Sequence, residues 1–274
     1  MLNLDNKKTL IMGVINITPD SFSDGGKYNT VEKALAHARQ LIDDGADILD
    51  VGGESTRPFS KPVSSDEELE RVIPVIKNLR KITDLPVSID TTKAIVAKEA
   101  LAAGASIVND VSAMAFDPEM ADTVSESDSP VVLMHMLGTP ENMQKNPSYS
   151  DLLNELLKFF MERIEFSLKK GIRKENIILD PGIGFGKTIE HNLLIIKNLN
   201  ILKTLGFPVL IGTSRKTFIR KLVEKDDFPN DKDVITGSIA SACAAVLNGA
   251  QIVRVHDVKE TKAALRVIDA LKNV

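Results

Sequence analysis

The sequence contains one cysteine, Cys243, among its 274 residues. A single cysteine excludes an internal disulfide framework and indicates a reducing compartment. With only four histidines besides, the chain does not assemble a ligand cluster of the zinc type. Cys243 lies in an alanine-rich stretch, residues 237–247, which predicts a buried helix, so we expect its thiol to be structural.

Long apolar runs and an excess of positive charge are also absent. No segment approaches the roughly 20 apolar residues of a membrane span, and residues 1–9 lack the apolar core of a signal peptide. The net charge of −4 argues against a broad surface for nucleic acid. We therefore expect a cytoplasmic protein with neither a membrane nor a nucleic-acid partner.

Short apolar runs alternate with stretches of helical spacing along the chain. Eight runs, mostly β-branched, end on polar residues; they span 10–16, 46–51, 86–90, 106–109, 130–135, 176–180, 208–212 and 251–256. Eight such units predict a closed parallel (β/α)8 barrel, or TIM barrel, and 274 residues is close to the ~250 typical of that architecture. We therefore predict a single α/β domain over residues 1–274.

The predicted helices lie between and after these runs. They span roughly 31–44, 66–83, 92–103, 118–125, 150–170, 190–204, 216–224, 234–248 and 258–272. A glycine follows a helix and precedes a strand at five places: Gly45, Gly104, Gly171, Gly206 and Gly249. Each is expected to supply the left-handed conformation that ends the helix.

Polar residues follow the predicted strands, at the rim where a parallel barrel carries its chemistry. They are Asn16, Asp50, Asp90, Asn109, His135, Asp180, Ser214, Arg215, Lys216, Arg254 and His256. Packing of a barrel interior requires none of them, so this surplus of polarity indicates function. Two loops, 16–26 and 52–65, are long for such connections and are predicted to lie over the mouth of the barrel.

Asp90, Asn109 and Asp180 are predicted to share one polar pocket. A carboxylate at a buried strand end is costly unless it is paired. Two carboxylates and a carboxamide suit a flat heterocycle with several N–H donors, such as an aminopyrimidinone. For Asp90, capping of the following helix is the alternative.

Residues 180–188 form a glycine-rich segment. Their glycine spacing fits neither a P-loop nor a dinucleotide-binding motif. The glycines would let backbone approach a flat ligand, with Phe185 available to stack on it; a generic turn is the alternative. Met134 is a further candidate to pack against such a ring.

Arg254 and His256 lie two residues apart and therefore share one face of the last strand. With Arg57 they offer groups suited to phosphate, although a salt bridge to Asp50 or Asp257 is the alternative reading. Lys216 opens a helix, where a cation is unfavourable, and this local cost also indicates function. Among the histidines, His37 and His191 are expected to be structural or solvated, while His135 is equally compatible with the site and the core.

These residues, in this order, resemble the dihydropteroate synthase family. The matching blocks cover nearly the whole chain: residues 13–26, 50–58, 87–91, 109–112, 133–136, 180–187, 213–216 and 254–256. The resemblance implies an eightfold barrel and a transferase of folate biosynthesis that sulfonamides inhibit. That enzyme joins 6-hydroxymethyl-7,8-dihydropterin diphosphate to p-aminobenzoate, giving 7,8-dihydropteroate and diphosphate.

The resemblance also implies a cofactor, a homodimer and the site residues. Mg²⁺ would bind the diphosphate with Asn16 as its protein ligand, and residues 234–247 could form the dimer contact. The implied catalytic residues are Asp20, Asp90, Asp180, Lys216, Arg254 and His256. The implied substrate-binding residues are Phe22, Thr56, Arg57, Pro58, Asn109, Met134, Gly184, Phe185, Gly212 and Thr217.

We expect a dissociative displacement, because a neutral aromatic amine needs no strong general base. Catalysis would then be mainly electrostatic, with cations on the leaving group and carboxylates on the developing cation. Two alternatives are a pterin-binding methyltransferase, which has no need of the cationic set, and a catalytically silent pterin-binding barrel. The presence of Asp20 and Arg57 argues against the silent barrel.

Overall fold

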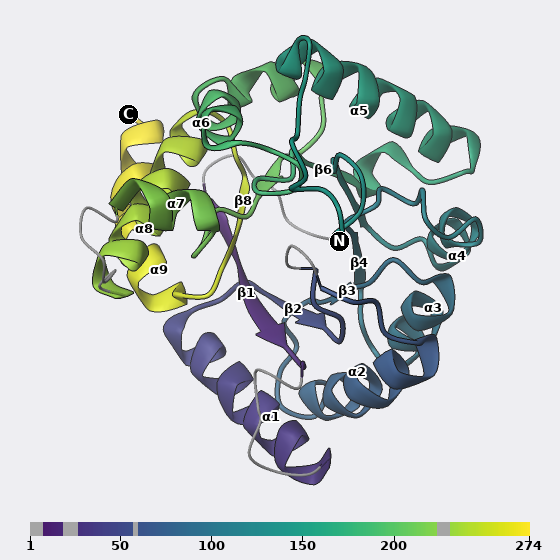
Figure 1. Cartoon of the computed structure of the whole chain (residues 1–274). Helices are drawn as coiled ribbons and strands as arrows, with labels where there is room; N and C mark the ends of the chain where they lie inside the picture. The colour runs from purple at the N-terminus through teal and green to yellow at the C-terminus, as the bar shows by residue number, and fades with distance from the viewer. Residues whose placement is uncertain (1–7, 19–26, 57–59, 224–230) are drawn as a thin grey trace.

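A computed structural model describes residues 8–18, 27–56, 60–223 and 231–274. Its strands are β1 (Leu10–Asn16), β2 (Ile48–Gly52), β3 (Val87–Asp90), β4 (Ile107–Asp110), β5 (Val131–Met134), β6 (Ile177–Asp180), β7 (Leu210–Ile211) and β8 (Ile252–Val255). They form one parallel sheet in the order β6-β5-β4-β3-β2-β1-β8-β7. A bridge between Leu179 and Val209 joins β6 to β7, so the sheet curls into the predicted barrel (Figure 1).

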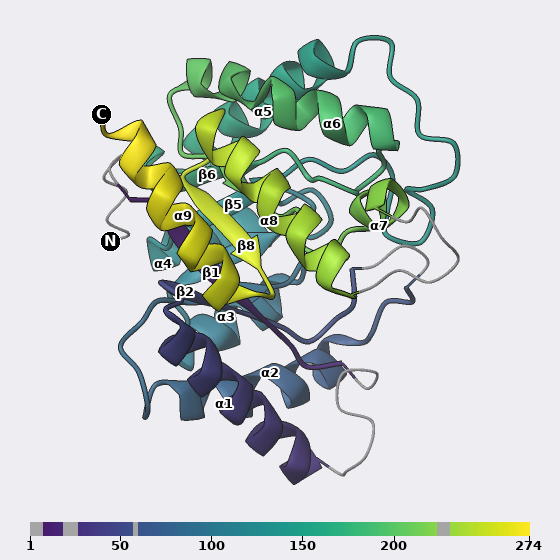
Figure 2. The ribbon, with the colours of Figure 1, turned by 90° about the vertical axis from the view of Figure 1, so that its left-hand side faces the viewer.

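Helices surround the strands. They are α1 (Lys27–Asp44), α2 (Ser65–Leu79), α3 (Ala94–Ala102), α4 (Met120–Ser127), α5 (Leu152–Lys169), α6 (Ile189–Lys197), α7 (Thr217–Val223), α8 (Asp231–Leu247) and α9 (Val258–Lys272), with short 3₁₀ helices η2 (Lys174–Asn176) and η3 (Leu199–Leu205). Figure 2 shows α8 and α9 side by side on the outside of the barrel, next to β8. Among the described residues, no helix is long and apolar enough to cross a membrane.

Two predicted elements differ from the structure. The helix predicted over 190–204 is divided into α6 and η3 at Asn198, whose backbone (φ −112°, ψ 25°) leaves the α-helical conformation. The strand predicted over 208–212 shrinks to Leu210–Ile211. The prediction for the five helix-ending glycines is confirmed, since all have positive φ, from 77° at Gly206 to 116° at Gly249.

The barrel interior explains why the rim is polar. Its floor is a separate apolar cluster of one inward residue from most strands: Met12, Ile48, Ile107, Val132, Ile178, Leu210 and Ile252. Side chains alternate along a strand, so residues two positions later point inward one layer higher. Those residues include Asp50, Asn109, Met134, Asp180 and Arg254. The same alternation that fills the barrel interior therefore points these polar side chains into its mouth, at the C-terminal ends of the strands.

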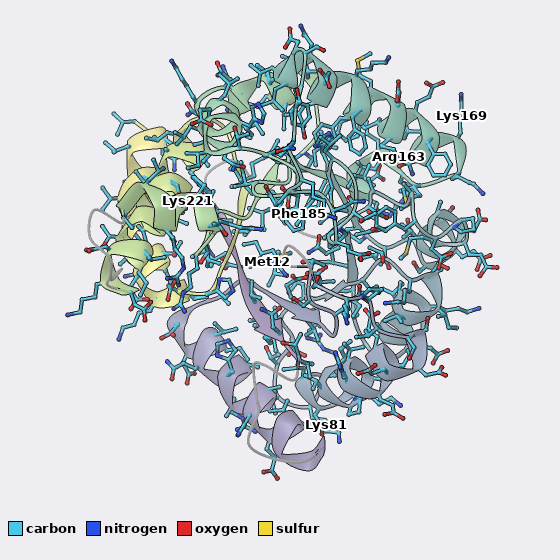
Figure 3. All side chains as sticks on the ribbon, in the orientation of Figure 1. Met12, Lys81, Arg163, Lys169, Phe185 and Lys221 are labelled. Carbon is cyan, nitrogen blue, oxygen red and sulfur yellow. The ribbon has the colours of Figure 1, made fainter. Side chains whose placement is uncertain are left out.

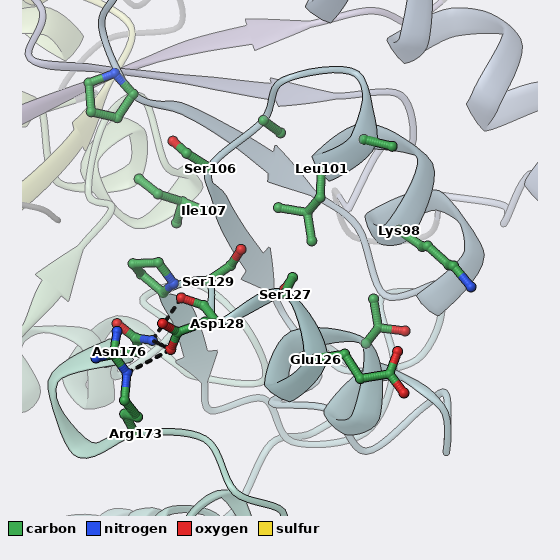
Figure 4. A pocket seen from close by; sticks show the side chains of 15 residues that line it. Lys98, Leu101, Ser106, Ile107, Glu126, Ser127, Asp128, Ser129, Arg173 and Asn176 are labelled. Atoms are coloured by element: carbon green, nitrogen blue, oxygen red, sulfur yellow. Dashed lines mark hydrogen bonds and ion pairs between the residues drawn. The ribbon is translucent and has the colours of Figure 1, made fainter.

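A cavity of about 710 Å³ lies at the opposite end, by the N-terminal ends of β3 to β6 (Figure 4). Lys98, Glu126, Asp128 and Arg173 are among its lining residues. Its Arg173–Asp128 ion pair is 2.6 Å long, and both side chains are about half exposed (45% and 57%). This cavity is remote from the polar strand ends.

Candidate active site

Arg254 ties together the polar groups in the mouth of the barrel. Its Nε donates to Asp50 Oδ2 at 2.6 Å, and its Nη2 donates to Asp90 Oδ2 at 2.7 Å. Asn109 Nδ2 donates to the same Asp50 oxygen at 3.3 Å. The Asp50 side chain is wholly buried, so four side chains from β2, β3, β4 and β8 converge on one buried network. The salt bridge to Asp50, our alternative reading of Arg254, is therefore present.

Asp90 does not cap the following helix. The N-cap position of α3 is Lys93, and no side chain accepts a hydrogen bond there. Instead Asp90 faces Arg254, and its buried Oδ1 forms no hydrogen bond with any residue that the structure describes. Burial raises the pKa of Asp90 to about 7, although the Arg254 charge opposes the shift. Asp90 is thus a buried acceptor with one unused oxygen.

Asp180 ends β6 and is also buried. Its Oδ1 accepts from the Gly182 backbone N–H at 2.8 Å. Burial raises the pKa of Asp180 to about 6, while the Gly182 hydrogen bond and the positive charges of Lys216 and Arg254 oppose the rise. These charges act on Asp180 only at short range, so the carboxylate belongs to the same mouth as Arg254.

Phe185 and Met134 form an apolar wall beside these acceptors. They pack in one buried cluster with Val111 and Met143, and Figure 3 shows Phe185 near the centre of the ring of strands. The ammonium of Lys216 lies 4.2 Å from the centroid of the Phe185 ring, a cation–π distance. The wall and the acceptors together can receive a flat heterocycle with polar edges.

Lys216 and His256 differ in charge. Burial lowers the pKa of Lys216 to about 8, with the Arg254 charge adding to the effect, so the amine still carries a proton at pH 7. Burial and Arg254 lower the pKa of His256 to about 4. His256 is therefore a neutral group, whose Nδ1 lies 3.1 Å from Ser214 Oγ. Arg215 points elsewhere, to an exposed ion pair with Asp257.

Asn16 supplies an amide oxygen at the end of β1. This Oδ1 would lie 3.8 Å from a Cβ placed on Gly52, the last residue of neighbouring β2. Among the described residues, no group of three or more His, Cys, Asp or Glu could hold a metal ion. Mg²⁺ keeps several waters and is commonly held by one or two protein oxygens plus substrate phosphates. A site completed by a phosphorylated ligand fits these residues, whereas a protein-only cage does not.

The base of the loop 52–65 is fixed by a network that the sequence did not reveal. Lys93 pairs with Glu54 and, at 2.5 Å, with the wholly buried Glu68 of α2. Glu54 Oε2 also accepts from the Val63 backbone N–H at 3.4 Å, which links the two sides of the loop. Burial alone would lower the pKa of Lys93, but the hydrogen bonds to both glutamates raise it overall. The lysine therefore stays charged.

The remaining predicted residues divide into two groups. A Cβ on Gly184 would lie 3.2 Å from Lys216 Cδ, and one on Gly212 would lie 3.7 Å from Arg254 Cβ, so both glycines border the mouth. Thr56 precedes the undescribed part of its loop, and Thr217 is exposed at the start of α7. Asp20, Phe22, Arg57 and Pro58 lie outside the described residues.

Three histidines lie among structural contacts. His37 Nε2 lies 3.2 Å from the Val14 carbonyl oxygen, and His191 completes a capping box with Thr188 at the start of α6. His135 is buried, and its ring lies edge-on to Phe159 at 4.8 Å. The prediction that His37 and His191 are structural or solvated agrees with the exposed side chain of His37 and the helix cap of His191. Cys243, also predicted to be structural, packs against the core from α8.

Comparison with known proteins gives one consistent result. The profile of the family described as pterin binding enzyme matches residues 12–256. The dihydropteroate synthase of Synechocystis sp. is 47% identical over 97% of this chain and 91% of its own length. That of Bacillus subtilis is 48% identical over 97% of this chain and 90% of its own length.

Solved structures agree with this. The Yersinia pestis dihydropteroate synthase in a sulfonamide drug complex superposes with a TM-score of 0.92 and 42% identity, covering 100% of this chain and 98% of its own. The Xanthomonas albilineans dihydropteroate synthase in complex with 7,8-dihydropteroate gives 0.88 and 43%, covering 100% and 96%. At these identities the similarity extends beyond the fold to the sequence of the whole barrel.

Proposed function

This chain belongs to the dihydropteroate synthase family, and from the geometry of its mouth we propose how it carries out that reaction. It joins 6-hydroxymethyl-7,8-dihydropterin diphosphate to p-aminobenzoate, releasing diphosphate and forming 7,8-dihydropteroate. The observation that carries the proposal is the network that joins Arg254 to Asp50 and Asp90 and joins Asp50 to Asn109. The buried Asp180, in register with Met134, stands at the same end of the barrel. Acceptors and cations therefore share one buried mouth.

The acceptors hold the pterin. Asp90 has a buried oxygen that accepts no hydrogen bond from the described residues, and the buried carboxylate of Asp180 lies at the end of β6. A carboxylate accepts two parallel N–H bonds from an amino-pyrimidinone edge, and such bonds are strong because the acceptor is charged. Phe185 and Met134 would cover the faces of the ring. The edge of the pterin ring would therefore contact carboxylates, and its faces would contact apolar side chains.

The cations act on the departing diphosphate. The carboxylates of Asp50 and Asp90 raise the pKa of Arg254 despite its burial, so its charge is permanent. Lys216 adds a second positive charge at pH 7, and the neutral His256 can donate one hydrogen bond. Fixed charges in a water-poor site stabilise a leaving group without reorganising at the moment of reaction.

The bond changes require little proton chemistry. The C–O bond between the exocyclic carbon of the pterin and the diphosphate breaks, and the electron pair leaves with the oxygen. The amine lone pair of p-aminobenzoate forms the new C–N bond, after which nitrogen loses one proton to solvent. Asp90 and Asp180 stabilise the positive charge on the pterin between these events. Thr56 and Arg57 are proposed to hold the diphosphate together with Arg254 and His256. The residues proposed for the p-aminobenzoate side and the covering loops are Asp20, Phe22, Arg57, Pro58 and Thr217.

Mg²⁺ is the proposed cofactor. When bound to the diphosphate it would neutralise charge on the leaving group, with the Asn16 amide oxygen as the protein ligand. A chelator should then abolish product formation, and added Mg²⁺ should restore it. Asn16→Leu should raise the Mg²⁺ concentration needed for half-maximal rate, while Asn248→Leu, which removes a side-chain contact to Ile196 on the barrel exterior, should not. Full activity in excess chelator contradicts this cofactor assignment.

A homodimer in the cytoplasm is the proposed state. The support for an interface is exposed apolar residues on the outer helices: Leu222, Leu247, Val267 and Leu271 are between 48% and 62% exposed. The lone cysteine supports a reducing compartment. Light scattering should give twice the chain mass of 29.9 kDa, and a monomer at micromolar concentration contradicts the dimer.

One assay tests the proposed reaction. Purified protein is mixed with Mg²⁺, the pterin diphosphate and p-aminobenzoate, and 7,8-dihydropteroate is measured by chromatography. The matched control replaces the diphosphate ester with 6-hydroxymethyl-7,8-dihydropterin, which should give no product because no leaving group is present. Methyl transfer from a methylated folate, with no dihydropteroate formed, would favour the methyltransferase instead; pterin binding without turnover would favour the silent barrel.

A further inference from the structure

Lys187 is a buried amine to which the proposed reaction assigns no part. The residue is 3% exposed, and its Nζ lies 2.9 Å from the Phe185 carbonyl oxygen, 3.0 Å from His135 Nδ1 and 3.3 Å from the His135 carbonyl oxygen. Among the described residues it forms no ion pair within 4.0 Å. Burying an amine is costly unless hydrogen bonds compensate, so these three contacts require an explanation.

The contacts of Lys187 join two rim loops whose backbones already touch. A Cβ on Gly182 would lie 2.0 Å from the His135 carbonyl oxygen, and one on Gly186 would lie 2.7 Å from the Leu137 carbonyl oxygen. Glycine is required at both positions, also because φ is 67° and 66°. The glycine-rich turn after β6 therefore packs against the chain that follows β5. The buried Lys187 links these two segments by hydrogen bonds to His135 and Phe185.

Two further contacts hold the same turn from outside. Gln144 Nε2 donates to the Gly184 carbonyl oxygen at 2.6 Å, and Tyr149 Oη donates to the Gly186 carbonyl oxygen at 2.8 Å. Both are neutral donors on the chain that follows β5. Lys187 differs from them because it donates to the carbonyl oxygen of Phe185, the residue whose ring faces the mouth.

We propose that Lys187 is a positioning residue for the pterin, which fixes the height of the Phe185 ring over the barrel by holding the Phe185 carbonyl against His135. The inference rests on the proposed function, because it assumes that Phe185 covers the pterin. A displaced ring would lose both its packing on Met134 and its 4.2 Å approach to Lys216. The consequence is a loss of pterin affinity rather than of p-aminobenzoate affinity.

The same geometry specifies the state of His135. An ammonium group can only donate, so Nδ1 of His135 accepts and the ring proton sits on Nε2. Burial and the Lys187 charge keep His135 neutral by lowering its pKa to about 3. Burial also lowers the pKa of Lys187 to about 7. Below that pH the ammonium has three donors for its three acceptors, whereas the uncharged amine above it keeps only two.

Nuclear magnetic resonance of ¹⁵N-histidine protein tests this arrangement without substrate. The chain has four histidines, and His135→Gln identifies the signal of His135 by its loss. The expected signal is a neutral ring protonated at Nε2 from pH 5.5 to 6.5, where Lys187 keeps its proton. A ring protonated at Nδ1, or one that titrates near pH 6.5, overturns the proposal even if no variant of Lys187 folds.

Kinetics of Lys187→Met test the functional consequence. We expect the KM of the pterin diphosphate to rise about tenfold or more, because small misplacements of contacting groups are costly, while the KM of p-aminobenzoate stays within twofold. Tyr149→Phe is the matched control: it removes one hydrogen bond to the same turn and should leave both KM values within twofold. A folded Lys187→Met with an unchanged pterin KM, or equal effects of the two variants, overturns the proposal. Failure of the wild-type protein to make dihydropteroate overturns the proposed function instead, since the histidine signal is measured independently.

Discussion

The two ends of the barrel hold similar side chains in different surroundings. At the N-terminal end, Arg173 and Asp128 pair beside a cavity of about 710 Å³, with 45% and 57% of their side chains exposed. At the C-terminal end, Arg254 pairs with Asp50 at the same 2.6 Å, but Arg254 is 21% exposed and Asp50 is wholly buried. An exposed pair contributes little to stability, whereas a buried charge needs its partner.

This difference in burial distinguishes the cavity at the N-terminal end from the candidate active site at the C-terminal end. The cavity at the N-terminal end is roomy, yet its charged residues are exposed to solvent, and Arg173 and Asp128 pair with each other. In the mouth, burial raises the pKa of Asp90 and Asp180 and lowers that of Lys216, because water no longer stabilises their charges. Charges held at such a cost indicate chemistry better than cavity volume does.

Arg254→Met should produce the largest contrast between the two ends. It leaves Asp50 and Asp90 buried without a cation, so the free energy of unfolding should fall by about 3–5 kcal/mol. Loss of a fixed charge on the leaving group should also lower kcat roughly 100- to 1,000-fold. Arg173→Met at the other end should cost at most about 1 kcal/mol and leave kcat unchanged. Urea unfolding and steady-state kinetics measure both, and similar losses in the two variants would remove the distinction.

Asp180→Asn should weaken pterin binding roughly 10- to 100-fold, because an amide has one acceptor oxygen and no charge. Isothermal titration calorimetry with the pterin diphosphate measures this. Asp128→Asn, its counterpart beside the cavity, should bind as the wild type does. Equal affinity in all three proteins would remove Asp180 from the pterin pocket.

Pterin affinity should depend on pH through the mouth alone. The side chains of Asp180 and Asp90 can each accept two parallel N–H bonds only when ionised, and burial raises their pKa values to about 6 and about 7. Pterin affinity is therefore greatest above both values and falls as pH drops through them, by up to about tenfold per unit for each group. Calorimetry from pH 5 to 8 measures the slope, which should be shallower in Asp180→Asn. A flat profile in the wild type contradicts the raised pKa values.

Ala102→Leu should have the smallest effect. Ala102 lines the cavity at the N-terminal end and is exposed, so a larger apolar side chain fills space without entering the core. Stability should change by no more than about 0.5 kcal/mol, and kcat and both KM values should stay within twofold. A several-fold change in any kinetic constant would show that the two ends communicate.

Much of the fold could be predicted because its signals are local. Each of the eight apolar runs overlaps one of the eight strands, and the glycines after the helices have positive φ. The break between α6 and η3 could not be predicted, because the helical spacing of residues 190–204 continues through Asn198. The length of β7 likewise depends on how the sheet closes on β6.

The candidate site was predicted as a set of residues but not as a network. Asp90, Asn109, Asp180, Phe185 and Arg254 were expected in one mouth, and the structure brings them together. Asp50 is among the predicted rim residues and its salt bridge to Arg254 is one of the alternatives, but its further contact with Asn109 could not be predicted. Nor was the neutral state of His256, which follows from burial beside a permanent cation.

Lys187 and Lys93 show most clearly what sequence reasoning missed. Each is a single lysine in a loop, and nothing in its neighbours along the chain indicates burial. Their roles arise because β5 and β6, or α2 and α3, place backbone carbonyls or glutamates around the amine. Such contacts join distant segments and leave no periodic pattern.

The sequence alone determined the barrel and the inward direction of its polar strand ends, because a repeat of two residues dictates which face each side chain takes. Only the tertiary structure decided which of those groups are in contact, which protonation state each one has, and which loops Lys187 and Lys93 hold in place. Those properties depend on distance and burial, since Coulomb energies and desolvation vary steeply over a few ångströms.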